Sequence, residues 1–371
     1  MIIRGSRLKE PRKIMVRATN WIGDAVISLP ALAALQARFP TAEIVLVAKS
    51  WVSGVYSHYP GIGRLIEYDP EGEHRGSRGF GRLIAQLRAE QFDGAILFQN
   101  AFHAAWMAWR AGIPHRIGYA RDARATLLTE AIEAPPPALY GHQAFYYLHL
   151  LFRCGLIARP EPSRALDEAW LEITREEKSW AESYLQSLGL HGPRFLVGLV
   201  PGASFGPAKR WPASRFAGLA DRLIAALNAD VLIFGSRAEK QLAEEVAQEM
   251  SHTPSVVAGE ATLDQSMALL ERCRLVITND SGSMHIASAL GLPVIAIFGS
   301  TDYHATGPLG PYAMAVQHTV ECNPCGLRVC PIDFRCMEGV TVTSAYRAAL
   351  EMVKELGITF DRPARGRQSF L

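Results

Sequence analysis

Several short segments of this chain combine residue types that suit the binding of a phosphate group. One is Asn279-Asp280-Ser281-Gly282-Ser283, which follows an apolar, β-branched run at residues 275–278. Ser and Gly residues that open a helix leave backbone N–H groups unpaired, and these bind anions together with the positive end of the helix dipole. The same pattern is typical of an ordinary, well-capped strand-to-helix corner. The segment by itself leaves both interpretations open.

Two further segments have the same ambiguity. Residues 201–212 (PGASFGPAKRWP) place Ser204 in a Gly-rich loop before Lys209, so backbone amides and an ammonium group are available for a diphosphate. No Gly-Lys-Ser/Thr is present, so this is not a Walker loop, and a solvated basic loop is the alternative. In residues 235–239 (GSRAE), the carboxylate of Glu239 suits either a ribose hydroxyl or a helix cap.

The acid–base candidate lies in Asn20-Trp21-Ile22-Gly23-Asp24. We expect Gly23 to allow a tight turn after the first strand, which would leave Asp24 near the start of a helix at the carboxyl edge of a sheet. A carboxylate there suits a general base that accepts a proton from an attacking hydroxyl. The alternative is that Asp24 only complements the helix N-terminus.

Four of the six cysteines are crowded into one segment. They are Cys322, Cys325, Cys330 and Cys336. The first pair has the C-x2-C spacing of half a zinc knuckle, but the second pair is spaced more widely. The pattern therefore leaves a structural metal site and free thiols as alternatives.

The elements that must position these residues alternate between short apolar strands and amphipathic helices, which is typical of doubly wound parallel sheets. The alternation runs twice, so we predict an α/β protein with two Rossmann-like domains. The expected divisions are an N-terminal extension (1–12), a first domain (13–175), a linker helix (176–192), a second domain (193–342) and a C-terminal helix and tail (343–371).

Charge and hydropathy exclude some classes of protein. The balance of 38 Lys and Arg against 36 Asp and Glu excludes a generally polybasic nucleic-acid binder. Up to Trp170 the chain has 20 basic and 15 acidic residues, so the first half is expected to meet an anionic partner. No apolar run has the length of a signal peptide or a membrane span. We therefore expect a cytoplasmic protein with at most peripheral membrane contact.

Three motifs, in this order, resemble glycosyltransferase family 9, the bacterial lipopolysaccharide heptosyltransferases. They are residues 20–26 (NWIGDAV) with 29–32 (LPAL), residues 209–212 (KRWP) with Phe216, and residues 279–287 (NDSGSMHIA). The Cys-Asn-Pro-Cys segment is similar to the heptosyltransferase II branch. The resemblance implies a GT-B fold, with two Rossmann-like domains facing across a cleft, the first holding the acceptor and the second the nucleotide sugar. It also implies inverting transfer of heptose from ADP-heptose to the lipopolysaccharide inner core, at the inner face of the membrane and without a metal or cofactor.

The resemblance assigns roles to individual residues. Asp24 becomes the general base, and Lys209 with the amides near Ser281, Gly282 and Ser283 neutralises the leaving ADP. Further donor contacts are implied for Ser204, Glu239 and His285, and Asp280 is expected to orient the loop or touch the donor sugar. Residues expected to contact the acceptor are Asn20, Trp21, Gly23, Arg116, Arg121, Arg124 and His142, although surface solubility explains the last four equally well.

Other functions remain as alternatives at this point. One is a family 9 transferase with a different acceptor or nucleotide sugar, and another is a non-catalytic nucleotide-sugar-binding protein. We expect a monomer.

Overall fold

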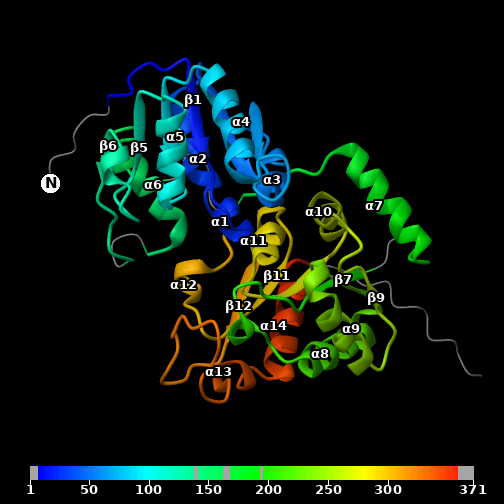
Figure 1. The fold of residues 1–371 in the computed structure, drawn as a ribbon. Helices are drawn as coiled ribbons and strands as arrows, with labels where there is room; N and C mark the ends of the chain where they lie inside the picture. The colour runs from blue at the N-terminus through cyan, green and yellow to red at the C-terminus, as the bar shows by residue number, and fades with distance from the viewer. Residues whose placement is uncertain (1–6, 138–140, 162–167, 193–194, 358–371) are drawn as a thin grey trace, which may run out of the picture. The chain divides into compact units, whose positions relative to one another are not determined.

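The computed structural model describes residues 7–137, 141–161, 168–192 and 195–357 (Figure 1). These form two compact units. Unit 1 comprises Met1–Glu172 and His304–Gly310, and unit 2 comprises Ile173–Tyr303 and Pro311–Leu371. Each unit contains one six-stranded sheet in which all strand pairs are parallel. The predicted pair of doubly wound α/β domains is confirmed.

The sheet of unit 1 has the strand order β3-β2-β1-β4-β5-β6. Its strands are β1 (Lys13–Arg17), β2 (Glu43–Lys49), β3 (Arg64–Tyr68), β4 (Gly94–Leu97), β5 (His115–Tyr119) and β6 (Glu130–Ile132). Strands β2 and β3 follow β1 toward one edge of the sheet. The chain then crosses back, and β4, β5 and β6 follow one another toward the other edge. The switch point of a doubly wound sheet, where ligands commonly bind, therefore lies between the carboxyl ends of β1 and β4.

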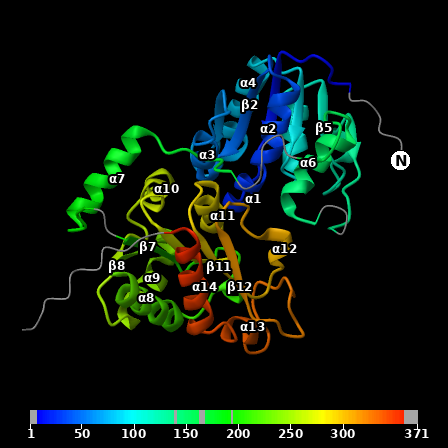
Figure 2. The same cartoon turned by 180° about the vertical axis from the view of Figure 1, so that it is seen from behind.

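Helices bury both faces of this sheet, so the residues of its central strands are almost all inaccessible (Figures 1 and 2). The helices are α1 (Ile22–Ile27), α2 (Leu29–Arg38), α3 (Ser50–Ser57), α4 (Gly76–Ala89), α5 (Phe102–Arg110) and α6 (Gln143–Arg153), with a short 3-10 turn η1 (Ala125–Leu127). On one face, Met15, Val45 and Ala95 pack against Leu83 and Leu87 of α4 in one apolar cluster. Burial on both faces explains why the residues between the ends of these strands are apolar.

Unit 2 has the same design, with the strand order β12-β11-β10-β7-β8-β9 and its switch point between β10 and β7. The strands are β7 (Phe195–Val200), β8 (Ala229–Ile233), β9 (Ser255–Val256), β10 (Leu275–Asn279), β11 (Val294–Phe298) and β12 (Ala313–Gln317). The helices are α7 (Arg175–Ser187), α8 (Ala213–Leu227), α9 (Lys240–Glu249), α10 (Leu263–Glu271), α11 (Gly282–Ala289), α13 (Arg335–Glu338) and α14 (Val342–Glu355), with 3-10 turns η3 (Pro207–Lys209) and η4 (Arg237–Glu239). The short helix α12 (Tyr303–Thr306) lies where the two units divide.

The structure differs from the sequence-based expectation at several boundaries. The helices α7 and α14, expected as a linker and a separate tail, belong to unit 2. The first helix is split into α1 and α2 because Pro30 cannot donate a backbone hydrogen bond. Part of the expected loose extension is ordered, since Leu8 is 3% exposed and the backbone N–H of Arg7 donates to Glu130. Residues 1–6 lie outside the described residues.

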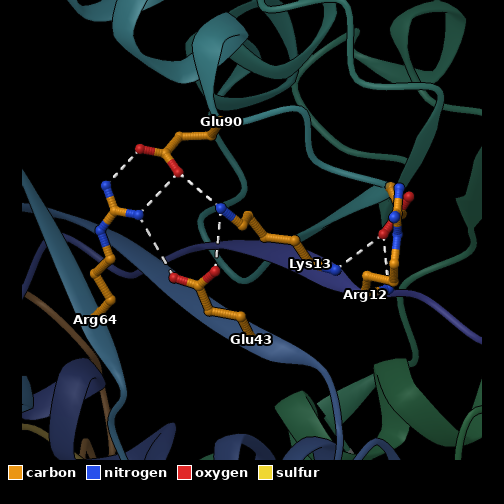
Figure 3. Close-up of polar contacts among 6 residues, drawn as sticks. Arg12, Lys13, Glu43, Arg64 and Glu90 are labelled. Carbon is orange, nitrogen blue, oxygen red and sulfur yellow. Dashed lines mark hydrogen bonds and ion pairs between the residues drawn. The ribbon is translucent and has the colours of Figure 1, made fainter.

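Ion pairs tie together the amino ends of the first three strands of unit 1 (Figure 3). Lys13 at the start of β1 is 3.1 Å from carboxylate oxygens of both Glu43 and Glu90. Arg64 at the start of β3 donates two hydrogen bonds to Glu90, of 2.9 and 2.5 Å. The cations at the starts of β1 and β3 therefore both have carboxylate partners.

The described helices are all too short or too polar to cross a membrane.

Candidate active site

The candidate site of unit 2 is built where loops from β7, β10 and β11 meet at the switch point. Asn279, the last residue of β10, is fully buried. Its Nδ2 donates to the carbonyl oxygen of Pro201 at 2.7 Å, and its Oδ1 accepts from the backbone N–H of Trp211 at 3.1 Å. One amide side chain therefore fixes both ends of the 201–211 loop.

Lys209 and Asp280 form the electrostatic centre of this site. The Lys209 Nζ is 2.5 Å from Oδ2 of Asp280, and the Thr301 hydroxyl donates to the same oxygen at 2.6 Å. Asp280 is only 5% exposed, whereas the Lys209 side chain is 13% exposed and lies 5.0 Å from the centre of the Phe205 ring. Of the two roles expected for Asp280, this geometry favours orienting the loop over touching a sugar.

Helix α11 begins immediately after Asp280. Ser281 occupies the N-cap position in an extended conformation without a side-chain capping bond, and Gly282 and Ser283 are the first helical residues. Backbone N–H groups in the first turn of a helix have no intrahelical acceptors, so this end of α11 suits an anion. His285, expected to contact phosphate, is 5% exposed within the packed part of the helix.

The other expected donor residues lie on neighbouring loops. Ser204 is exposed on the loop after β7. Glu239 forms a capping box with Ser236, accepting hydrogen bonds from its backbone N–H (3.0 Å) and hydroxyl (2.8 Å). A Cβ atom on Gly202 would lie 2.2 Å from Oε1 of Glu239, so this glycine allows the two loops to meet. Glu239 has the capping role that the sequence left open.

The cysteine-rich segment supports the donor loop, which the sequence did not reveal. Arg328 donates from Nε to the carbonyl oxygen of Phe205 at 2.7 Å, and its own carbonyl accepts from the N–H of Ala208 at 3.1 Å. The N–H of Gly326 donates to the carbonyl oxygen of Ser300, just after β11. A Cβ on Gly206 would lie 2.3 Å from the Arg328 carbonyl oxygen, so the contact requires glycine there.

The four cysteines of this segment are free thiols. Cys322 and Cys325 are exposed and Cys336 is buried, and burial raises the pKa of the Cys336 thiol. Across the described ranges, no group of three or more His, Cys, Asp and Glu side chains is arranged to hold a metal ion.

In unit 1, Asp24 lies in the first turn of α1, the first helix after β1, on the side of the switch point. Behind this helix the Tyr56 hydroxyl lies 3.3 Å from the Thr19 hydroxyl and 3.1 Å from the Ser28 hydroxyl. Burial, and next the negative charge of Asp24, raises the pKa of Tyr147 well above its usual value. Asp24 therefore lies near the buried Tyr147. The hydrogen bond between Tyr56 and Ser28, the C-cap residue of α1, helps to position the helix.

The tight turn expected at Gly23 is not there. Gly23 is a helical residue of α1, and the chain turns at Asn20 and Trp21 instead. Trp21 is 59% exposed, and Asn20 accepts a 2.9 Å hydrogen bond from NH2 of the buried Arg17. Sequence reasoning missed Arg17, although a charged residue that ends an apolar strand at the carboxyl edge was a usable signal.

Three of the four basic residues considered for the acceptor have local structural partners instead. Arg116, near the amino end of β5, donates to the carbonyl oxygens of Leu127 (2.6 Å) and Ile113 (2.5 Å). Arg124 is fully buried and donates from Nε to the Tyr119 carbonyl at 2.8 Å, and burial lowers its pKa to about 10. Their guanidinium groups are therefore committed to protein oxygens.

His142 is the third. It is the N-cap of α6, where Nδ1 accepts from the N–H of Ala144 at 3.1 Å and Nε2 lies 2.9 Å from the Gly307 carbonyl oxygen. This pattern requires the neutral ring, and burial lowers the pKa of His142. Both ring nitrogens therefore have protein partners, and acceptor contact by His142 stays a prediction. Arg121, in contrast, is exposed just beyond the carboxyl end of β5.

Comparisons with known proteins agree with this architecture. A family model described as glycosyltransferase family 9 (heptosyltransferase) matches residues 80–334. Lipopolysaccharide heptosyltransferase 2 of Escherichia coli (strain K12) is 32% identical over 314 residues, which cover 82% of this chain and 88% of that protein. Lipooligosaccharide heptosyltransferase 2 of Haemophilus influenzae is 30% identical with the same coverage. The structure of E. coli ADP-heptose lps heptosyltransferase II matches with a TM-score of 0.79 at 27% identity, covering 93% of this chain and 99% of that one.

Two doubly wound units with polar residues at both switch points, together with these matches, define a glycosyltransferase of the GT-B fold class. The non-catalytic alternative is excluded. The chain belongs to glycosyltransferase family 9, as the motifs at residues 20–26, 209–212 and 279–287 predicted.

Proposed function

We propose that this protein transfers a heptose from ADP-heptose to the inner-core heptose of lipopolysaccharide, with inversion at the anomeric carbon. The observation that carries the proposal is the similarity to lipopolysaccharide heptosyltransferase 2 over 82% of the chain. In the proposal, unit 1 binds the acceptor and unit 2 binds the nucleotide sugar.

The chemistry of unit 2 supports a leaving diphosphate. When the bond between the anomeric carbon and the phosphate oxygen breaks, negative charge develops on that oxygen. Lys209, held by Asp280, and the N–H groups of Gly282 and Ser283 supply an ammonium and unpaired donors to stabilise it. Ser204, Ser281 and His285 remain proposed further contacts to the donor.

Asp24 is the proposed general base. The acceptor hydroxyl oxygen forms the new bond to the anomeric carbon, its proton passes to the Asp24 carboxylate, and ADP leaves with the electrons of the broken bond. General bases contribute about 10²- to 10⁴-fold to a rate. Asn20, Trp21 and Arg121 remain proposed acceptor contacts, and contact with the inner membrane and a monomeric state remain predictions.

The test is a transfer assay with ADP-heptose and lipid A that carries Kdo and one heptose, with the product identified by mass. We expect Asp24→Asn to lower kcat at least about 100-fold while ADP-heptose binds normally. Asp122→Asn, at an exposed aspartate of the same unit, is the matched control and should transfer normally. Full activity of Asp24→Asn would refute the base assignment, and transfer only to a different acceptor would refute the proposed substrate.

A further inference from the structure

The two edges of the unit 1 sheet differ in how their cations are neutralised. At the amino edge Lys13 and Arg64 are paired with Glu43 and Glu90 (Figure 3). At the carboxyl edge, β1 ends at Arg17 and β2 ends at Lys49, and neither has an ion pair with a described residue. Positive charge that is not held in an ion pair is therefore concentrated at the edge where this class of sheet binds ligands.

Arg17 is buried in an unusual way. It is 2% exposed and donates from NH1 to the carbonyl oxygens of Ala18 and Val47, at 2.5 and 3.2 Å. Its Nε has no hydrogen-bond partner among the described residues, whereas the Nε of the equally buried Arg124 donates to a carbonyl. Burying an unpaired charge is costly, so this arginine is more than a packing residue.

Asn20, which accepts a hydrogen bond from Arg17, and its neighbours Trp51 and Lys49 are all at least partly exposed. The Lys49 Nζ lies 4.4 Å from the centre of the Trp51 ring, and Trp51 is 42% exposed. The indole Nε1 of Trp51 donates to the Asn20 carbonyl at 2.9 Å, while Arg17 donates to the Asn20 side-chain oxygen at 2.9 Å. Because that oxygen is occupied, the Asn20 amide is fixed with its Nδ2 donors directed away from Arg17.

His103 and Tyr68 complete the surroundings. The two rings stack with centroids 5.8 Å apart, and the Arg17 guanidinium carbon is 5.8 Å from the Tyr68 ring centre. Burial, then Arg17 and Lys49, lowers the pKa of His103. Burial and Arg17 also lower the pKa of Lys49, and Glu71 is the acidic residue that partly opposes this.

We propose that Lys49 and the Asn20 amide form an anion-binding subsite, with Arg17 beneath them as a positioning residue, for a carboxylate or phosphate group on the sugar acceptor. The subsite rests on the proposed transferase function. The exposed face of Trp51 lies beside the anion and offers an apolar platform for the sugar ring that carries it.

The first experiment compares Lys49→Met with Lys49→Arg and with the control Lys9→Met, at an exposed lysine before β1. Lys49→Met should raise the KM for the acceptor about tenfold, with the KM for ADP-heptose within about twofold of the wild-type value. Lys49→Arg should restore most acceptor affinity, and Lys9→Met should change neither constant. An unchanged acceptor KM in Lys49→Met would overturn the subsite.

Calorimetric binding of the deacylated acceptor, without ADP-heptose, keeps this test independent of the proposed function. If the wild-type protein transfers no heptose, the proposed function fails, but weaker binding by Lys49→Met still supports the subsite and equal binding overturns it. Repeating the comparison with a phosphatase-treated acceptor identifies the group. If phosphatase treatment abolishes the difference in acceptor affinity between wild type and Lys49→Met, the bound group is a phosphate. If the difference persists, the group is a carboxylate.

A second variant separates ligand binding from a purely structural role. Asn20→Asp places a carboxylate at the position to which Arg17 now donates at 2.9 Å. The variant therefore supplies Arg17 with a permanent counterion from the protein itself. We expect the variant to unfold at a higher temperature than the wild type and to bind the acceptor at least about tenfold more weakly. Lower stability with unchanged acceptor binding would contradict an uncompensated charge at Arg17.

Discussion

The ion pairs of Asp280 and Glu260 show how burial changes the effect of an ion pair on stability. Lys209–Asp280 and Lys240–Glu260 both have N–O distances of 2.5 Å. The side chains of the first pair are 13% and 5% exposed, whereas those of the second are 43% and 50% exposed. Desolvation makes the loss of one partner costly only in the first pair.

At the residue scale, we therefore expect Lys209→Met to lower the free energy of unfolding by about 3 kcal/mol, because Asp280 is left charged and buried. The matched control Lys240→Met should have a much smaller effect, because solvent screens this exposed pair. Urea unfolding monitored by circular dichroism measures both. Adding Asp280→Asn to Lys209→Met should recover part of the loss, and equal costs for the two lysine variants would contradict this account.

At the element scale, Glu90 at the end of α4 joins the starts of β1 and β3 (Figure 3). Burial by itself raises the pKa of Glu90, but hydrogen bonds from Arg64 and Lys13 outweigh it, so the pKa is lowered. A carboxylate with a lowered pKa in the folded state stabilises the protein above its unfolded-state pKa, and this contribution is lost as the pH falls.

We expect Glu90→Gln to lower the free energy of unfolding by about 1–2 kcal/mol at pH 7, because two cations lose their shared partner. The difference from wild type should shrink as the pH falls below the ordinary glutamate pKa. The control is Glu351→Gln, at an exposed glutamate of α14. Urea unfolding at pH 7 and pH 4 tests the prediction, and a constant difference would contradict it.

Helices and strands can be predicted from the sequence where their apolar residues follow one clear period, that of a helix or that of a buried strand. The continuous apolar run at residues 195–200 is typical of a buried strand and forms β7, and the helical spacing of Phe216, Leu219, Ala220 and Leu223 is typical of an amphipathic helix and lies in α8. The sequence did not predict α5, whose residues FHAAWMAWR are apolar almost all round, nor β12, whose residues are all half-buried. β12 takes its conformation from its pairing with β11, which its own residue pattern does not reveal.

At the scale of the whole molecule, three histidines of unit 1 share one property. Burial lowers the pKa of His103, His142 and His149. In the unfolded chain these rings bind protons below about pH 6.5, whereas in the folded protein they bind them only at lower pH. Stability should therefore fall as the pH falls through that range.

His142→Asn tests this, because asparagine is a good N-cap that does not titrate there. We expect the protection of α6 amides in native-state hydrogen exchange to fall between pH 7.5 and 5.5 in the wild type, after correction for intrinsic exchange, and to fall less in His142→Asn. His191→Asn, at an exposed histidine of unit 2, should behave as wild type. Equal pH dependence in all three proteins would contradict the prediction.

The sequence by itself determined the fold class, the family and the chain positions of both switch-point loops, because these depend on local periodicity and on short motifs after strands. Only the tertiary structure decided what each polar side chain does there. His142 caps a helix and Asp280 holds Lys209. Arg17 lies buried beneath Asn20 without a counterion. These roles depend on the strand order, which brings together side chains that are far apart along the chain. The spacing of residues in the sequence therefore does not predict them.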